Sequence, residues 1–287
     1  MVDIIHGATG AQGSPVLSAL TAAGRTAIAA VRHPEAVPDG IAARQVDLAS
    51  ADSLASAYEG ADGVFVHLPM GAPETAAAQA RAVVEAVTRA RPGRVVISTS
   101  GQIVDRPDSP LQATADSPIM TLIDGVTGSG IPTAVVAPRL YLENLLLPVV
   151  LAPAHQEGVL RYPLPASFPV SWSSHLDVAD VVARLLMDTS VSGTVAVGHR
   201  PGLTGVDLAA AFSNHLGREV HFEAITPEAF GALITPLFGP AAAPVVELYR
   251  ALNAQDGCII AEDSSAQELL GLRPRPIEQW LKDLAVS

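Results

Sequence analysis

Three glycines near the N-terminus are spaced as G-x-x-G-x-x-G, a pattern that suits the binding of a dinucleotide. The segment is Gly7-Ala8-Thr9-Gly10-Ala11-Gln12-Gly13, between a short apolar run and an amphipathic pattern that starts at Ser14. Glycines there permit a tight bend and a close approach of backbone N–H groups to a pyrophosphate, which the helix N-terminus also attracts. The alternative is a strand-to-helix turn that only needs flexible residues. We expect cofactor contacts from Gly7, Thr9, Gly10, Ala11, Gln12 and Gly13.

Arg32 lies directly after the second apolar run, nineteen positions beyond Gly13. An NAD-preferring site usually places an acidic residue at this point, where it binds the ribose 2′-hydroxyl. An arginine instead suits a 2′-phosphate, which it binds through charge-assisted hydrogen bonds. The alternative is a solvated side chain at a strand end. The spacing favours NADP(H) over NAD(H).

Three further loops follow apolar runs and are expected to face the same crevice. In an open parallel sheet the ligand lies across the carboxyl ends of the strands. Asp47 is expected at the adenine edge, the loop after the fourth strand beneath the cofactor, and the Ser/Thr loop after the fifth near the nicotinamide and the substrate. The last of these is equally consistent with a capped, hydrogen-bonded loop. The residues concerned are Asp47, Leu48, Leu68, Pro69, Met70, Ser98, Thr99 and Ser100.

Tyr141 and Asn144, just past the sixth apolar run, are candidates for the wall that faces the nicotinamide and for orienting a substrate carbonyl. Ser100 is a third and weaker candidate for this catalytic set. For Tyr141 the alternative is a packed aromatic ring at the start of a helix. His175 next to Asp177 is interpreted as a helix cap rather than as a general base.

The remaining polar residues are interpreted as structural. Asp105 and Asp108 lie in a proline-rich loop and are interpreted as turn residues. The eight histidines show no spacing typical of metal ligands. Tyr162, Phe168 and Trp172 lie in an irregular segment, where they line an apolar substrate pocket or anchor a C-terminal lobe to the main domain.

Composition narrows the class of protein. The 287 residues are 49% hydrophobic and 16% charged, so a large core is expected, and the net charge of −12 argues against a nucleic-acid partner. A single cysteine, Cys258, excludes a disulfide framework within the chain. The N-terminus leads straight into an apolar run, and the most apolar long run, 140–154, is interrupted and too short to span a bilayer. We expect a cytoplasmic protein with a small-molecule substrate and no membrane or nucleic-acid partner.

Short β-branched runs alternate with longer helical patterns, which predicts a doubly wound parallel sheet of the Rossmann type. We expect a dinucleotide-binding domain over 1–150 and a smaller, mixed α/β substrate lobe over 151–287, with some segments of the second half returning to the main sheet. The expected strands are 2–5, 27–31, 42–46, 63–67, 94–98, 133–137, 194–198 and 220–224. The expected helices are 14–23, 51–58, 73–91, 117–130, 176–187 and 204–216, with the remainder mainly helical.

Together these segments resemble the NmrA-like branch of the atypical short-chain dehydrogenase/reductases. The resemblance rests on the glycine turn, Arg32, Asp47-Leu48, Ser98-Thr99-Ser100, Pro138-Arg139-Leu140-Tyr141-Leu142-Glu143-Asn144, Val178-Ala179-Asp180-Val181-Val182 and the stretch 208–227. It covers most of the chain. It implies an NADP(H)-binding Rossmann domain with a small C-terminal substrate lobe, in a family that includes reductases and regulators that bind the nucleotide without turnover.

One departure from the short-chain dehydrogenases concerns proton transfer. Their usual Tyr-x-x-x-Lys pair does not occur here, because no tyrosine has a lysine four residues later and Lys282 is the only lysine. We therefore expect a reductase for a small apolar carbonyl, enone or quinone-like acceptor that needs little acid assistance, as a monomer or homodimer. The alternatives are an NADP(H)-binding sensor without turnover and a non-redox cyclase or isomerase on the same fold.

Overall fold

Strand β1 (Val2–His6) lies inside a parallel sheet, between β2 (Thr26–Val31) and β4 (Gly63–His67). The computed structural model describes residues 1–286, and in this part of the chain seven strands form the sheet in the order β3-β2-β1-β4-β5-β6-β8. The remaining strands are β3 (Ala43–Gln45) and β8 (Gly193–Val197) at the two edges, and β5 (Val95–Ser98) and β6 (Thr133–Pro138) inside the sheet. Strand order reverses between β1 and β4, so a crevice is expected at their carboxyl ends.

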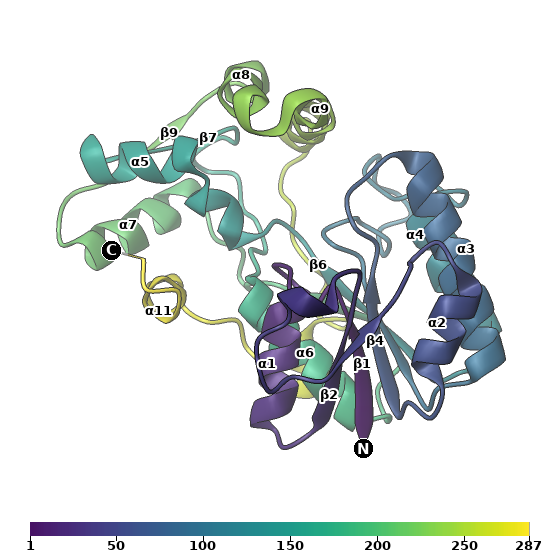
Figure 1. Ribbon diagram of the computed structural model, residues 1–287. Helices are drawn as coiled ribbons and strands as arrows, with labels where there is room; N and C mark the ends of the chain where they lie inside the picture. The colour runs from purple at the N-terminus through teal and green to yellow at the C-terminus, as the bar shows by residue number, and fades with distance from the viewer. Residues whose placement is uncertain (287) are drawn as a thin grey trace.

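Helices cover both faces of this sheet, which confirms the doubly wound Rossmann-like prediction (Figure 1). On one face α2 (Ala51–Tyr58), α3 (Pro73–Ala90) and α4 (Pro118–Gly128) pack on the inward side chains of β1, β4 and β5. On the other face are α1 (Gly13–Ala22), α6 (His175–Met187) and α10 (Ala266–Leu270). The central strands are buried on both faces, which explains why their sequences are nearly continuous apolar runs.

A smaller lobe lies beside the carboxyl edge of the sheet, at the upper left of Figure 1. Its β7 (Val159–Tyr162) and β9 (His221–Ala224) pair in parallel as a two-stranded sheet. Its helical elements are η2 (Leu142–Leu146), α5 (Pro148–Gln156), α7 (Gly205–Leu216), α8 (Pro227–Phe238), η3 (Gly239–Ala241), α9 (Ala242–Asn253) and α11 (Ile277–Asp283). The short η1 (Pro34–Ala36) belongs to the loop after β2.

The lobe has its own hydrophobic core, rich in aromatic rings. Tyr162 packs edge-on against Trp172 and Tyr249, and all three are almost completely buried. Phe168 belongs to the same cluster. These rings therefore form the core of the lobe itself, a role that neither interpretation of the aromatic residues named. The segment around them is also less irregular than expected, because α5 and β7 form there.

Segments from the second half of the chain return to the main sheet. Strand β8 pairs with β6 in parallel, and α6 packs beside α1. The chain therefore passes between the sheet and the lobe several times. The boundary near residue 150 marks the first of these passages, and as a domain limit it stays a prediction.

The α8–η3–α9 hairpin exposes several large apolar side chains. The stretch Pro227–Asn253 is the one segment, within residues 1–286, that is long and apolar enough by length and composition alone to cross a membrane. In the structure it is bent at η3, and Arg250 Nε lies 2.6 Å from Glu228 Oε1 between its two arms. Leu233, Leu237 and Phe238 are exposed on it.

Candidate active site

The glycine turn forms a tight bend between β1 and α1. Gly7 has a φ of +61°, a conformation that favours glycine, and its carbonyl accepts a 2.8 Å hydrogen bond from Gly10 N–H. A Cβ on Gly13 would lie within 2.5 Å of the His6 carbonyl oxygen, so the third glycine lets the helix start against the strand. No acidic residue occurs in the first turn of α1, so its N-terminus stays favourable for an anion.

The neighbours of this turn fit a dinucleotide. A Cβ on Gly10 would meet only the Gly7 carbonyl, at 3.2 Å, so this side of the turn is open to a ligand. Two buried polar atoms at the adjoining strand ends, His67 Nε2 and Thr99 Oγ1, have no hydrogen-bond partner within residues 1–286. Such atoms are rarely left unpaired, and a ligand rich in hydroxyl and phosphate oxygens would satisfy them.

Arg32 directly follows β2, beside the strand that carries the glycine turn. Its side chain is exposed, and no carboxylate lies within ion-pair distance of it in the described chain. Gln45 Nε2 donates to the Arg32 carbonyl at 3.2 Å, which ties the backbone here to β3. The guanidinium is therefore not engaged by a carboxylate of the described chain, and its binding of a 2′-phosphate stays a prediction.

The loops after β3 and β4 also reach this edge, with mixed roles. The Asp47 carboxylate accepts from Ala49 N–H at 2.9 Å and so holds its own turn, although the side chain is exposed. Leu48 packs on the core beneath α2 and α3. Leu68 is buried, Pro69 is exposed, and Met70 is 92% exposed. Cofactor contacts from this group stay predictions.

Four polar side chains from distant segments meet at the carboxyl ends of β5 and β6. The Oε1 atom of Gln12 accepts from Ser98 Oγ at 2.9 Å and from Tyr141 Oη at 3.2 Å. Its Nε2 donates to Ser100 Oγ at 3.0 Å. The glycine turn and the predicted nicotinamide wall are therefore joined by one side chain. We call Gln12, Ser98, Ser100 and Tyr141 the amide cluster.

One residue of the amide cluster has a strained backbone conformation. Ser100 has a φ of +54°, unusual for a residue with a side chain, and Gly101 follows at +90°. The Ser98 hydroxyl accepts from Ser100 N–H at 3.2 Å and supports this conformation. Strained backbone of this kind costs about 1–3 kcal/mol and clusters at functional sites.

Tyr141 is a hydrogen-bond donor in this site and not a base. Burial raises its pKa above the usual value, opposite in direction to the effect of the lysine in a Tyr-x-x-x-Lys pair. The hydroxyl therefore stays protonated at neutral pH. The one lysine, Lys282, is exposed on α11 in the lobe, so it does not replace the missing partner.

His175 packs against Tyr141, a contact that the sequence did not indicate. Its ring lies against Tyr141, with ring centroids 4.4 Å apart. Burial and then the proximity of His67 lower the pKa of His175 to about 4, so it is neutral at pH 7, and its 3.8 Å approach to Glu143 is then not an ion pair. Asp177 does cap α6 as expected, but its partner in the capping box is Ser174, so the interpretation of His175 as a cap residue is wrong.

The structure says different things of two further polar residues. Asn144 lies in η2 at the start of the lobe, and its expected role in orienting a substrate carbonyl stays a prediction. The interpretation of Asp105 as a turn residue is wrong, because its carboxylate pairs with the buried Arg139 at 2.8 Å.

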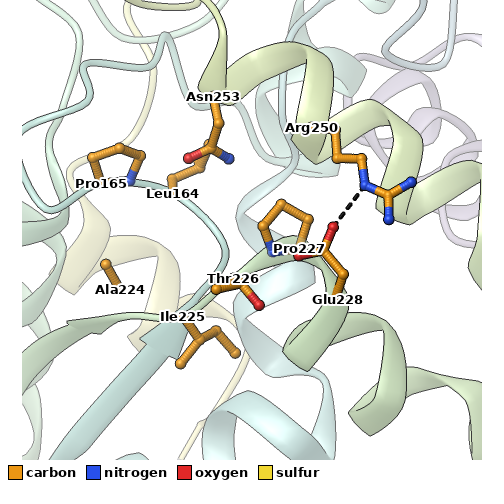
Figure 2. Close-up of a pocket in the computed structure, with 9 residues that line it drawn as sticks. All are labelled: Leu164, Pro165, Ala224, Ile225, Thr226, Pro227, Glu228, Arg250 and Asn253. Carbon is orange, nitrogen blue, oxygen red and sulfur yellow. Dashed lines mark hydrogen bonds and ion pairs between the residues drawn. The ribbon is translucent and has the colours of Figure 1, made fainter.

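A separate concave surface lies in the lobe (Figure 2). It has a volume of about 480 Å³ and lies between the ends of β7 and β9 and the α8–α9 hairpin. Its strongest charges, Arg250 and Glu228, are paired with each other. None of the predicted site residues lines it, and no group of three or more possible metal ligands occurs anywhere in the described chain.

Comparison with known proteins identifies the class. Residues 3–281 match the NmrA-like family, and the chain belongs to that family. The chain is 30% identical over 230 residues to an NAD(P)H azoreductase from Xenophilus azovorans, covering 78% of this chain and 77% of the relative. It is therefore a member of a family that contains NAD(P)H-dependent reductases.

Solved structures share the fold. Triphenylmethane reductase from Citrobacter sp., complexed with NADP(H), superposes with a TM-score of 0.79 at 21% identity, over 98% of this chain and 99% of the other. A nucleoside-diphosphate-sugar epimerase from Staphylococcus aureus gives 0.79 at 20% identity, over 98% and 100%. NADPH-dependent quinone oxidoreductase from Escherichia coli, complexed with NADPH, gives 0.73 at 21% identity, over 99% and 100%.

Proposed function

We propose that this protein is an NADP(H)-dependent reductase for a small, mostly apolar carbonyl, enone or quinone-like acceptor. One observation carries the proposal. The glycine turn, with the N-terminus of α1 behind it, is joined through Gln12 to the hydroxyls of Ser98, Ser100 and Tyr141. A dinucleotide seated on the turn and directed along this crevice reaches the carboxyl ends of β5 and β6, where those hydroxyls lie.

Each part of the crevice has a distinct task in this proposal. The turn and the N-terminus of α1 bind the pyrophosphate, and Arg32 binds the 2′-phosphate. When bound, NADPH supplies a hydride. Tyr141, kept protonated by burial, presents its single O–H at the nicotinamide end of the crevice, and His175 packs against the Tyr141 ring.

The absence of a lysine partner for Tyr141 restricts the chemical class of acceptor that the protein can reduce. Tyr141 has no basic partner that lowers its pKa, so it is a poor proton donor to an alkoxide. Quinones and conjugated enones accept hydride without a strong acid at the reacting atom, and the protein then contributes mainly by orienting the reactants. Coloured aromatic acceptors belong in the same set, since relatives act on azo and triphenylmethane compounds.

The test is a turnover assay with purified protein. NADPH consumption is followed by absorbance with a panel of one benzoquinone, one naphthoquinone, one conjugated enone, one azo dye and one triphenylmethane dye. We expect turnover with at least one member, a lower rate with NADH, and none for the Gly10→Val variant. Tight NADPH binding without turnover across the panel would favour the nucleotide-sensing alternative. We also propose a cytoplasmic location and a monomer or homodimer.

A further inference from the structure

The geometry points to Ser98, Ser100 and Tyr141 as a binding subsite for a primary carboxamide, which the Gln12 side chain fills in this structure and the nicotinamide carboxamide takes when Gln12 swings out. The inference rests on the proposed function, because it assigns the part of the crevice that receives the reactive end of NADP(H). It makes Gln12 an internal competitor of the cofactor.

The hydrogen-bond pattern around Gln12 defines the ligand chemistry. Two hydroxyl donors, Ser98 Oγ and Tyr141 Oη, converge on one carbonyl oxygen at 2.9 and 3.2 Å. One hydroxyl acceptor, Ser100 Oγ, lies 3.0 Å from the amide nitrogen. Neither a carboxylate nor a simple ketone has an N–H group that could donate to Ser100 Oγ. A primary carboxamide satisfies all three hydroxyls.

The subsite is built and not a solvent-exposed contact. Ser98 is completely buried, and burial keeps Tyr141 protonated and thus a donor. The strained backbone of Ser100 fixes the position of the third hydroxyl. Gln12, in contrast, extends from the turn at the N-terminus of α1, and its backbone forms the cap of that helix without use of its side chain. Its side chain is therefore free to leave without loss of a helix cap.

The location matches the ligand. Nicotinamide carries a primary carboxamide at the end of NADP(H) opposite the adenosine 2′-phosphate. Arg32, the proposed 2′-phosphate ligand, and the amide cluster lie on the two sides of the glycine turn, after β2 and after β5 and β6. A dinucleotide that spans this edge of the sheet brings its carboxamide to the hydroxyls that hold the Gln12 amide.

The experiment compares two ligands by isothermal titration calorimetry. NADP⁺ reaches the subsite, whereas adenosine 2′,5′-bisphosphate carries the 2′-phosphate and lacks nicotinamide. For Gln12→Ala we expect NADP⁺ to bind about tenfold more tightly, because the Gln12 amide no longer competes for the subsite. Binding of the bisphosphate should change by less than about twofold.

A second comparison tests the amide itself. The 3-acetylpyridine analogue of NADP⁺ replaces the amide N–H group with a methyl group. Ser100→Ala should weaken NADP⁺ binding severalfold and leave binding of the analogue unchanged, since the analogue has no donor for Ser100 Oγ. Ser98→Ala, which removes a donor to the carbonyl oxygen, should weaken both.

The results that would contradict the competitor role of Gln12 differ from those that would contradict the proposed cofactor site. Weaker or unchanged NADP⁺ binding by Gln12→Ala, or an equal change for both ligands, would overturn the competitor role and make Gln12 a residue that merely supports the turn. Failure of the wild-type protein to bind either ligand would instead overturn the proposed cofactor site.

Discussion

Nη2 of Arg139 lies 2.8 Å from both carboxylate oxygens of Asp105, which ties the loop after β5 to the end of β6. The Arg139 side chain is 1% exposed and that of Asp105 is 12% exposed. The same loop begins at Ser100 and Gly101, and a Cβ on Gly101 would lie 3.1 Å from the Arg139 carbonyl oxygen. The pair therefore holds two sides of the amide cluster at a fixed separation.

Asp105→Asn should lower the free energy of unfolding by about 3–5 kcal/mol, since it leaves the buried Arg139 charge without its carboxylate. The measurement is urea denaturation at pH 7. Asp108→Asn is the matched control, because Asp108 lies in the same loop and is exposed, and it should change stability by less than about 0.5 kcal/mol. Equal effects of the two substitutions would show that the pair does not stabilise the fold.

Arg32→Ala should weaken NADPH binding about 10- to 100-fold and leave NADH binding nearly unchanged. The reason is that charge-assisted hydrogen bonds contribute about 1.5–3 kcal/mol each, and only NADPH carries the 2′-phosphate. Fluorescence titration of both nucleotides measures the ratio. Arg184→Ala, in the last turn of α6 and away from the carboxyl edge, is the control. Equal losses for NADPH and NADH would rule out the 2′-phosphate assignment.

Gly10→Val and Gly13→Val should separate binding from folding. A Cβ on Gly10 meets one carbonyl at 3.2 Å, so valine fits the fold with a small shift and blocks the approach of a pyrophosphate. A Cβ on Gly13 overlaps the backbone of residues 6 and 7, so valine there should destabilise the protein. Thermal unfolding and nucleotide titration distinguish the two variants. Normal NADPH titration by Gly10→Val would remove the binding site from this turn.

Acid should destabilise the protein through His6, which is buried and shares a 2.7 Å hydrogen bond with Tyr58. Burial, followed by the proximity of His67, lowers the pKa of His6 from 6.5 to about 3. The unfolded chain therefore binds one more proton than the folded protein between these values. The resulting stability is complete above pH 6.5 and is lost as the pH falls toward 3, by about 1.4 kcal/mol per pH unit.

Urea denaturation from pH 7.5 to 4.5 measures this slope. His6→Gln should flatten it, although the variant is less stable at pH 7. His33→Gln is the control, since His33 is exposed on the loop after β2, and it should leave the slope unchanged. An unaltered slope in His6→Gln would assign the acid sensitivity to other groups, of which His175 is the first to examine.

The sequence predicted most of the fold because its signals are local. Glycine spacing, β-branched runs and capping residues specify β1 to β6 and the helices between them from neighbours a few residues apart. Strand β7 was missed because it is only four residues long, Val159–Tyr162, with an arginine in the third position and Gly158 before it. Each residue of β7 pairs with a residue of β9 that lies 62 positions later, as Val159 does with His221, so no local pattern predicts the pairing.

The site was predictable only in part for the same reason. Gln12 was expected from its position in the turn, but the partners of its side chain are 86 to 129 residues away. His175 was interpreted as a cap residue, and nothing in its neighbourhood along the chain indicates that it packs on Tyr141. Asp105 likewise finds Arg139 across 34 positions. These pairings depend on how the strands are ordered in the sheet.

The repeated passage of the chain between sheet and lobe limits how the lobe can be exchanged. The lobe core draws on three separate stretches of sequence, and β8, α6 and α10 of the main sheet lie between them. A chimera that takes its lobe from a relative therefore needs a fusion point at each passage of the chain between sheet and lobe. A single fusion point near residue 150 would remove the edge strand β8 from the nucleotide-binding half. The lobe is therefore not a contiguous segment that can be exchanged by a single replacement.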